Sequence, residues 1–229
     1  MNYKNLAIIG TSHIAKQSLE EVEKAIVEGK PDIIALELDN KRLYSLFKKP
    51  GKLRFYDIKR VGIKGFIFSI IGAWAEKKLG SMVGVPPGSE MKKAVRLARE
   101  HNIKLALIDQ DIEVTLKKFS KSLSWKEKWN FLVDIIKAIF VRKNIIEFDL
   151  TKVPDKKTIK KLVRNVKERY PNVYKVLVEE RNHVMANNLK KIMDLHPDKK
   201  ILAIIGAGHE DDILDLIKKP SISYSFRVG

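Results

Sequence analysis

The chain has 229 residues and a formal net charge of +17, from 45 Lys and Arg against 28 Asp and Glu. It contains no cysteine, which excludes disulfides and thiolate metal sites, so any metal would need His, Asp or Glu ligands. No apolar run is long enough to cross a bilayer, and the N-terminus does not have the pattern of a secretory signal. These features predict a cytoplasmic protein with one large domain, residues 1–229.

The excess of basic charge is concentrated between residues 112 and 170, which include 16 basic and 7 acidic residues. Such a surface attracts anions, whether nucleic acid, acidic lipid head groups or acidic peptides. The alternative is a thermophile-like composition rich in Lys and Ile, because charged surfaces stabilise proteins more at high temperature. No nucleic-acid-binding motif is recognisable, so we expect no specific nucleic-acid binding.

The N-terminal part predicts a parallel βαβ unit. Residues 5–9 are apolar and end at Gly10, as expected for a buried strand. Ser18 to Glu21 forms a capping box, which predicts the start of a helix that ends before Pro31. Residues 32–39 then predict a second buried strand.

The segment 65–75 is apolar on all faces and follows a short basic stretch, yet it is too short to span a bilayer. Three interpretations stay open. It is a core helix, a contact surface between copies in a homodimer, or an interfacial helix whose basic flank meets anionic lipid.

The rest of the chain returns to strands after a helical region. A helix over 86–101 and a strand over 103–108 precede helices that fill residues 112–195. The last long apolar strand covers 201–205 and is followed by a short helix, while 221–228 is a candidate edge strand. The order predicts an α/β fold with a mixed, mostly parallel central sheet built from two related halves, and a helical insertion at about 112–195.

One octapeptide is nearly repeated at the two ends of the chain. LAIIGTSH, ending at His13, returns as LAIIGAGH, ending at His209, and each histidine follows its strand glycine, Gly10 or Gly206, by three residues. Functional side chains of parallel sheets gather beyond the carboxyl ends of the strands. If the two strands are neighbours, both imidazoles reach the same edge of the sheet.

Carboxylates are predicted at the same edge. Glu37 and Asp39 follow the second strand, and Asp109 and Asp111 follow the third. Two histidines with a carboxylate and an open position are typical of hydrolytic metal centres, and a second carboxylate can act as general base. The alternative is that each histidine only caps the next helix or bonds a neighbouring carbonyl.

Arg181 is predicted to point inward, because Leu177 and Val184 share its helix face. An inward guanidinium needs carboxylate partners or an anionic ligand. Tethered by Glu37 or Glu90, it is either a structural ion pair or a group that stabilises an oxyanion.

The chain resembles the TraB/PrgY family from about residue 6 to 215. Six motifs occur in the family's order: GTSH, ALELDNKR, PGSEM, IDQDIEVTL, EERNHVM and GAGH. The family is related to the Tiki and GumN proteins. The resemblance implies a two-halved α/β fold with paired GxxH motifs, which serve metal-dependent proteolysis in the Tiki branch. PrgY proteins are implicated in the shutdown of peptide pheromones at membranes.

The resemblance implies roles for individual residues. His13, His209 and Glu37 would bind metal, while Glu37, Glu90 and Arg181 would act in catalysis. The other expected pocket residues are Gly10, Ser12, Asp109, Asn182 and Gly206. This chain has Asp109-Gln110-Asp111 where relatives commonly have Asp-Arg-Asp, so one arginine is replaced.

Three functions are compatible with these patterns. The first is a metal-dependent, peptidase-like hydrolase that uses Mn, Co or Zn and acts on peptides, including signalling peptides. The second is a non-catalytic regulatory protein that binds a peptide or small ligand, as a homodimer or at a membrane surface through residues 65–75. The third is an esterase with a His–Glu pair and no metal.

Overall fold

The structure is a computed structural model that describes residues 1–11, 16–48, 86, 88–140 and 156–219. The predicted edge strand at 221–228, the apolar segment 65–75 and the residues Ser12 and His13 lie outside this part. The sheet strands are β1 (Asn2–Tyr3), β2 (Leu6–Thr11), β3 (Ile33–Leu36), β4 (Lys104–Leu107) and β5 (Ile201–Gly206). The helices before the middle region are α1 (Lys16–Gly29), α2 (Asn40–Phe47) and α4 (Ser89–Glu100).

The described residues of the middle region are mainly helical, as predicted, and lead back to the sheet. Its helices are α5 (Ile112–Ser122), α6 (Trp125–Phe140), α7 (Lys156–Arg169), α8 (Pro171–Tyr174) and α9 (Glu180–Leu195), followed after β5 by α10 (Glu210–Lys218). A π-helical segment, Lys175–Glu179, joins α8 to α9. α9 covers one face of the sheet, so the end of the helical region is part of the main core.

The five strands have the order β1-β2-β5-β3-β4, with β1 antiparallel to β2 and the other pairs parallel. The prediction of a mixed, mostly parallel sheet is therefore confirmed. The two copies of the repeated octapeptide lie on neighbouring strands, β2 and β5. β5 is central, because this strand from the C-terminal part of the chain pairs with β2 on one side and with β3 on the other.

The register between β2 and β5 is offset by one residue relative to the repeat. Leu6 lies opposite Ile201, and Thr11 lies opposite Gly206. Side chains alternate between the faces of a strand, so equivalent residues of the two copies point to opposite faces. Leu6 packs with α9 and α10, whereas its equivalent Leu202 packs with α1 and α4.

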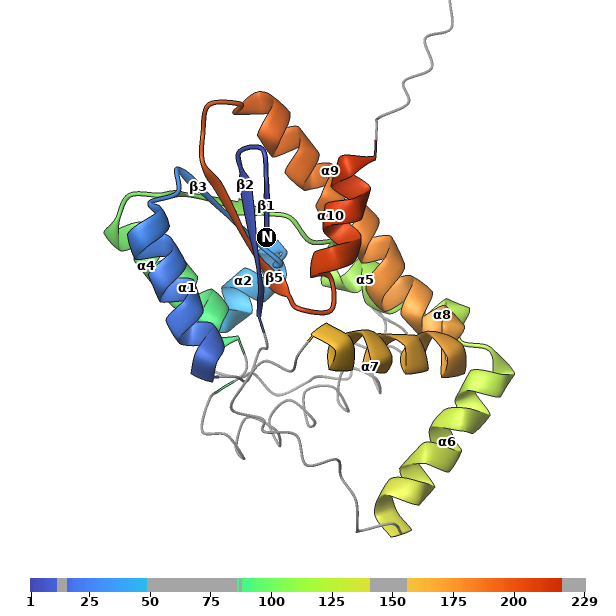
Figure 1. Ribbon diagram of the computed structural model, residues 1–229. Helices are drawn as coiled ribbons and strands as arrows, with labels where there is room; N and C mark the ends of the chain where they lie inside the picture. The colour runs from blue at the N-terminus through green and yellow to red at the C-terminus, as the bar shows by residue number, and fades with distance from the viewer. Residues whose placement is uncertain (12–15, 49–85, 87, 141–155, 220–229) are drawn as a thin grey trace, which may run out of the picture.

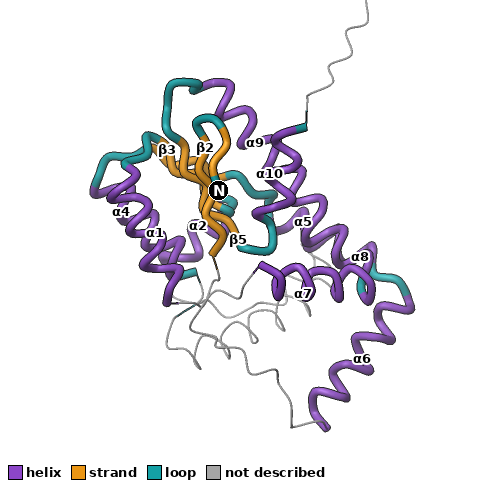
Figure 2. Tube along the Cα trace, viewed as in Figure 1, coloured by secondary structure: helices purple, strands orange, loops and turns teal. Residues whose placement is uncertain are grey.

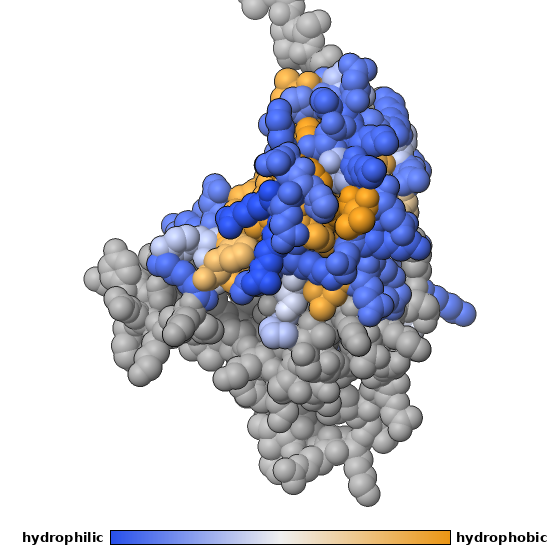
Figure 3. All heavy atoms as spheres, turned by 90° about the vertical axis from the view of Figure 1, so that its left-hand side faces the viewer, coloured by the Kyte–Doolittle hydropathy of each residue, from blue (hydrophilic) through white to orange (hydrophobic). Residues whose placement is uncertain are grey.

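Each face of the sheet has its own layer of helices (Figures 1 and 2). Ile8 and Ile205 pack against Met185 and Leu189 of α9 on one face. On the other face, residues of β3 and β5 pack against Val22 of α1 and Met91 of α4. Seen from the α1 and α4 side, the described surface is mainly hydrophilic, because the apolar residues of these helices face the sheet (Figure 3).

The start of α1 differs from the prediction. The helix begins at Lys16, two residues before the expected cap Ser18. Ser18 is fully buried within the first turns, so the predicted capping box at 18–21 is wrong in its placement. In contrast, the capping box Ser124–Glu127 forms at the start of α6, where Ser124 N donates to Glu127 Oε2 at 2.9 Å and Glu127 N donates to Ser124 Oγ at 3.2 Å.

Candidate functional site

The carboxyl ends of β2, β5, β3 and β4 meet at one edge of the sheet, where a chain of ion pairs begins at Glu37. Glu37 follows β3 directly, and its Oε2 accepts a hydrogen bond from the backbone N–H of Gly206, the last residue of β5, at 2.5 Å. Its Oε1 contacts Nη2 of Arg181. Only 4% of the Glu37 side chain is exposed, so this carboxylate connects two strands and α9 inside the protein.

Arg181 joins two buried carboxylates. Its Nη2 donates to Asp109 Oδ2 at 2.5 Å, its Nε donates to Asp109 Oδ1 at 3.1 Å, and its Nη1 donates to the Leu177 carbonyl at 3.0 Å. Burial alone would lower the pKa of Arg181, but the Glu37 and Asp109 carboxylates raise it above its ordinary value. The guanidinium therefore stays charged and balances both carboxylates.

The predicted helix face of Arg181 is correct in part. The most deeply buried side chains of α9 are one position further along, and include Asn182, Met185 and Leu189. Val184 is only half-buried. Arg181 thus lies at the border of the buried stripe of α9, and 14% of its side chain is exposed. From this position its guanidinium reaches the carboxylates at the strand ends. The π-helical segment that precedes α9 changes which residues of the following helix face the core. Such segments are often found at functional sites.

Arg42 extends this network, although the sequence did not single it out. Its Nη2 contacts Asp109 Oδ2, and its Nε donates to Asp39 Oδ2 at 2.8 Å. Asp39 also caps α2 by accepting from the backbone N–H groups of Lys41 and Arg42. The available signal was the spacing in ELDNKR, which places Arg42 three residues after Asp39 on the first turn of a helix.

His209 lies directly before α10 and is held by a second polar chain. Its Nδ1 is 2.6 Å from Asn182 Oδ1, and Asn182 Nδ2 donates to Asp212 Oδ2 at 3.1 Å. The bond to Asp212 identifies the amide nitrogen of Asn182, so its oxygen accepts from Nδ1–H of His209. In the neutral imidazole the lone pair is then on Nε2, which lies 3.6 Å from Glu37 Oε1.

The structure thus brings together five predicted site residues: Glu37, Asp109, Arg181, Asn182 and His209. Of the two glutamates considered as tethers for Arg181, Glu37 contacts it. Glu90 is buried in the first turn of α4, where a carboxylate is favourable. His13 and Ser12 lie outside the described residues, so the convergence of the two GxxH histidines stays a prediction.

The residue Gly10 lets the two repeated segments approach each other closely. A Cβ atom at Gly10 would lie 2.9 Å from the Cα of Ala207 and 2.9 Å from Glu210 Oε2. We expect Gly10→Ala to lower the free energy of unfolding by about 1–3 kcal/mol, because the backbone would have to move. Gly29→Ala at the end of α1 is the control. Apart from its chain neighbours and the backbone of α1, no atom lies within 4 Å of its new Cβ, so urea denaturation should show no loss of stability.

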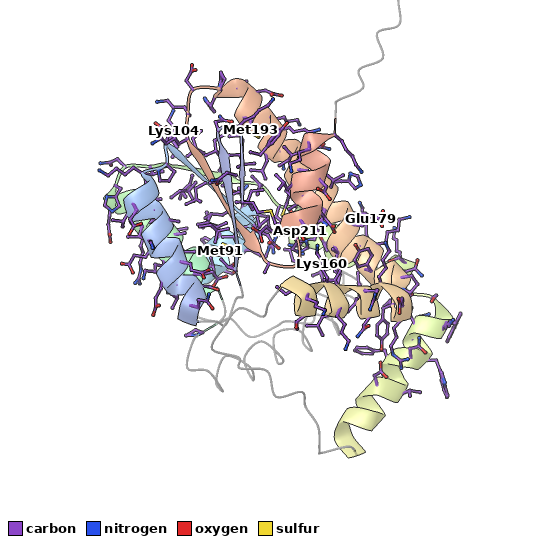
Figure 4. All side chains as sticks on the ribbon, in the orientation of Figure 1. Met91, Lys104, Lys160, Glu179, Met193 and Asp211 are labelled. Atoms are coloured by element: carbon purple, nitrogen blue, oxygen red, sulfur yellow. The ribbon has the colours of Figure 1, made fainter. Side chains whose placement is uncertain are left out.

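A cavity of about 410 Å³ opens beside this cluster, between α7 and the turn after β5. Its walls carry opposite charges, with Lys160, Arg164 and Lys167 on α7 and Asp211 and Asp212 on α10. Lys160 and Asp211 face each other across it and form an ion pair at 2.8 Å, which raises the pKa of Lys160 (Figure 4). The described lining reaches Gly208, next to His209, but does not include Glu37, Arg181 or His209 itself.

Comparison with known proteins identifies the family of this chain. The model described as the TraB/PrgY/gumN family matches residues 2–223, nearly the whole chain. The chain belongs to the TraB/PrgY/gumN family. The motifs quoted above for this family include Glu37, Arg181 and His209, which the fold brings to one sheet edge.

Relatives in the family span a wide range of organisms. An uncharacterized protein of Methanocaldococcus jannaschii is 36% identical over 228 residues, which cover 96% of this chain and 55% of the relative. TraB domain-containing proteins of Bos taurus and Homo sapiens are 22% and 21% identical and cover 88% of this chain. The chain spans less than two thirds of the length of these relatives, 55% to 60%.

Two further findings concern metal ligands and membrane-spanning helices in the described part of this TraB-family chain. Among the described residues, no group of three or more His, Asp or Glu side chains is arranged to hold a metal ion. In the same part of the chain, no helix combines the length and the apolar character needed to cross a bilayer. Gln110, between Asp109 and Asp111, donates from Nε2 to Thr115 Oγ1 at 2.8 Å.

Proposed function

We propose that this chain is a metal-dependent, peptidase-like hydrolase whose centre lies at the carboxyl ends of β2, β5 and β3. The observation that supports the proposal best is the position of His209. Its Nδ1 is held by Asn182, and its Nε2 faces Glu37 Oε1. The neighbouring residue Gly208 lines the cavity beside this pair. An imidazole oriented through its other nitrogen is the arrangement found in metal ligands and general bases.

The described residues fit a metal site in part. His209 Nε2 and Glu37 Oε1 are 3.6 Å apart, a separation that two ligands at about 2.1 Å from one ion can span. Arg181 also contacts this oxygen, so Glu37 would share it between the guanidinium and the ion. We propose His13 as a third ligand, since it follows Thr11, which lies opposite Gly206 at the same edge. A mixed nitrogen and oxygen set suits Mn, Co or Zn.

The chemistry of the bound ion would be to lower the pKa of a water and to polarise a carbonyl. The protein's own residues would keep this centre in place. Asn182 fixes the tautomer of His209, and Arg181 holds Glu37 between β3 and β5. The hydrogen bonds of Arg181 run to Asp109, Glu37 and the Leu177 carbonyl. We therefore assign Arg181 the role of positioning Glu37 rather than of stabilising an oxyanion directly. We assign proton transfer to Glu90 as part of the same proposal.

The decisive measurement is the metal content of purified protein, paired with cleavage of a peptide library. We expect His209→Ala to lower bound Mn, Co or Zn by on the order of tenfold or more, and chelator to abolish cleavage. His183→Ala is the matched control, since His183 is an exposed histidine of α9 and should leave both unchanged. Equal metal content and activity in wild type and His209→Ala would refute the proposal.

A second candidate is a binding protein that captures a peptide or small ligand without cleaving it. The observation that favours it is that Glu37, Asp109 and Arg181 satisfy one another, as expected of a structural network. The oppositely charged walls of the neighbouring cavity would then hold the ligand. Stoichiometric peptide binding with no turnover in the presence of Mn or Zn would favour this candidate.

A further inference from the structure

The outer face of α6 carries two exposed tryptophans. Trp125 is 84% exposed and Trp129 is 67% exposed, and the two lie one helical turn apart. The chain has only three tryptophans in all. Large aromatic side chains are seldom left this open to water, and two on one face mark a contact surface.

The acidic residues of α6 point away from this face. Glu127 is buried and accepts hydrogen bonds from Ser124 and from Asn172 at the start of α8. Asp134 binds Arg169, whose Nε donates to its Oδ2 at 2.6 Å. Both carboxylates are therefore engaged with neighbouring elements, and neither contributes negative charge to the outer face.

The charges beside the tryptophans are positive. Lys126 is exposed next to Trp125, and Lys128 Nζ lies 4.0 Å from the centre of the Trp125 ring. Lys121, near the end of α5, is also exposed. Figures 1 and 2 show α6 at the periphery, on the opposite side of the molecule from α1 and α4.

We propose that this face of α6, formed by Trp125, Trp129, Lys126 and Lys128, binds the surface of an anionic lipid bilayer. Indole rings prefer the boundary between head groups and acyl chains, and lysines near an anionic surface add electrostatic attraction. A convex helix face with two indoles suits a broad, deformable surface. A nucleic acid would be expected to use a groove with stacking platforms, and a second copy of this basic chain would be repelled. The contact is peripheral and independent of the proposed hydrolase.

The test uses the purified full chain and vesicles of phosphatidylcholine, with or without about 30% phosphatidylglycerol. We expect sedimentation with the anionic vesicles only, together with a blue shift of tryptophan emission and quenching by brominated lipid. Trp125→Ser/Trp129→Ser should lower the partition coefficient by on the order of tenfold or more. Leu195→Ser is the control, because Leu195 is 74% exposed at the far end of α9 and should leave binding unchanged.

Three outcomes would overturn the proposal. The first is no binding of wild type to anionic vesicles, and the second is equal binding by the double variant. The third is a loss of affinity for single-stranded RNA, or of self-association in analytical ultracentrifugation, that in the double variant exceeds its loss of vesicle binding. Circular dichroism of the double variant checks that α6 is still folded.

Discussion

Replacing Arg181 with methionine will lower the free energy of unfolding by about 3–5 kcal/mol at neutral pH. The substitution keeps much of the aliphatic packing but removes the cation between Glu37 and Asp109. Both carboxylates are buried, with 4% and 0% of their side chains exposed. Glu37 also connects β3 to Gly206 of the central strand, so its repulsion from Asp109 would act on the sheet edge itself. Urea denaturation followed by circular dichroism measures the loss.

The penalty in Arg181→Met should depend on pH in a defined direction. Without the guanidinium, burial should raise the folded-state pKa of the Glu37 carboxyl above its unfolded value. A carboxyl group with a raised folded pKa stabilises the protein only while it is protonated, so this stability is lost as pH rises. The variant should therefore be closer to wild type at about pH 5 than at about pH 8.

The control for this prediction is another paired arginine at the surface. Arg169 forms hydrogen bonds with Asp134, but its side chain is 42% exposed, so water can replace these contacts. Arg169→Met should change the unfolding midpoint much less than Arg181→Met. Equal losses in the two variants would show that the Glu37–Arg181–Asp109 network does not hold the sheet edge.

The sequence predicted the frame of this site because each element has a strong local signal. The apolar runs before Gly10 and Gly206 predicted neighbouring central strands, and β2 pairs with β5 as expected. The parallel direction then placed Glu37, Asp109 and His209 at one edge. The inward position of Arg181 was predicted from helical periodicity, because apolar residues occupy neighbouring positions on the same helix face.

What the sequence could not predict depends on contacts between distant segments. The one-residue offset between the two copies depends on packing on both faces of the sheet. With this offset, α1 and α10, which follow the two copies, lie on opposite faces. No residue pattern distinguishes a π-helical segment from an α-helix in the sequence, so the prediction placed the buried stripe of α9 one residue too early. Arg42 was missed because its partner Asp109 is 67 residues away. Asn182 was expected only as a pocket residue, and its bridge from Asp212 to His209 depends on where α10 begins.

Glu127 supports a second large prediction, because one buried carboxylate caps two helices. It closes the capping box with Ser124 at the start of α6, and its Oε1 accepts from the backbone N–H of Asn172 at 2.7 Å and of Val173 at 3.3 Å, at the start of α8. We expect Glu127→Gln to lower the free energy of unfolding by about 2–3 kcal/mol. The amide offers one acceptor in place of two, and its NH₂ group would face the donors of Ser124 or Asn172.

The effect of Glu127→Gln should vanish at low pH. Burial alone would raise the pKa of Glu127, but hydrogen bonds from Asn172 and Ser124 lower it below its ordinary value of 4.5. A carboxylate with a depressed folded pKa stabilises the protein above its unfolded pKa, and this contribution is lost as pH falls through the folded value. Wild type should therefore lose stability below about pH 4.5 while the variant loses less, so that their denaturation curves converge. Glu168→Gln, on the exposed surface of α7, should follow wild type throughout. A constant difference between wild type and Glu127→Gln at every pH would show that the charge of Glu127 does not stabilise the junction of α6 and α8.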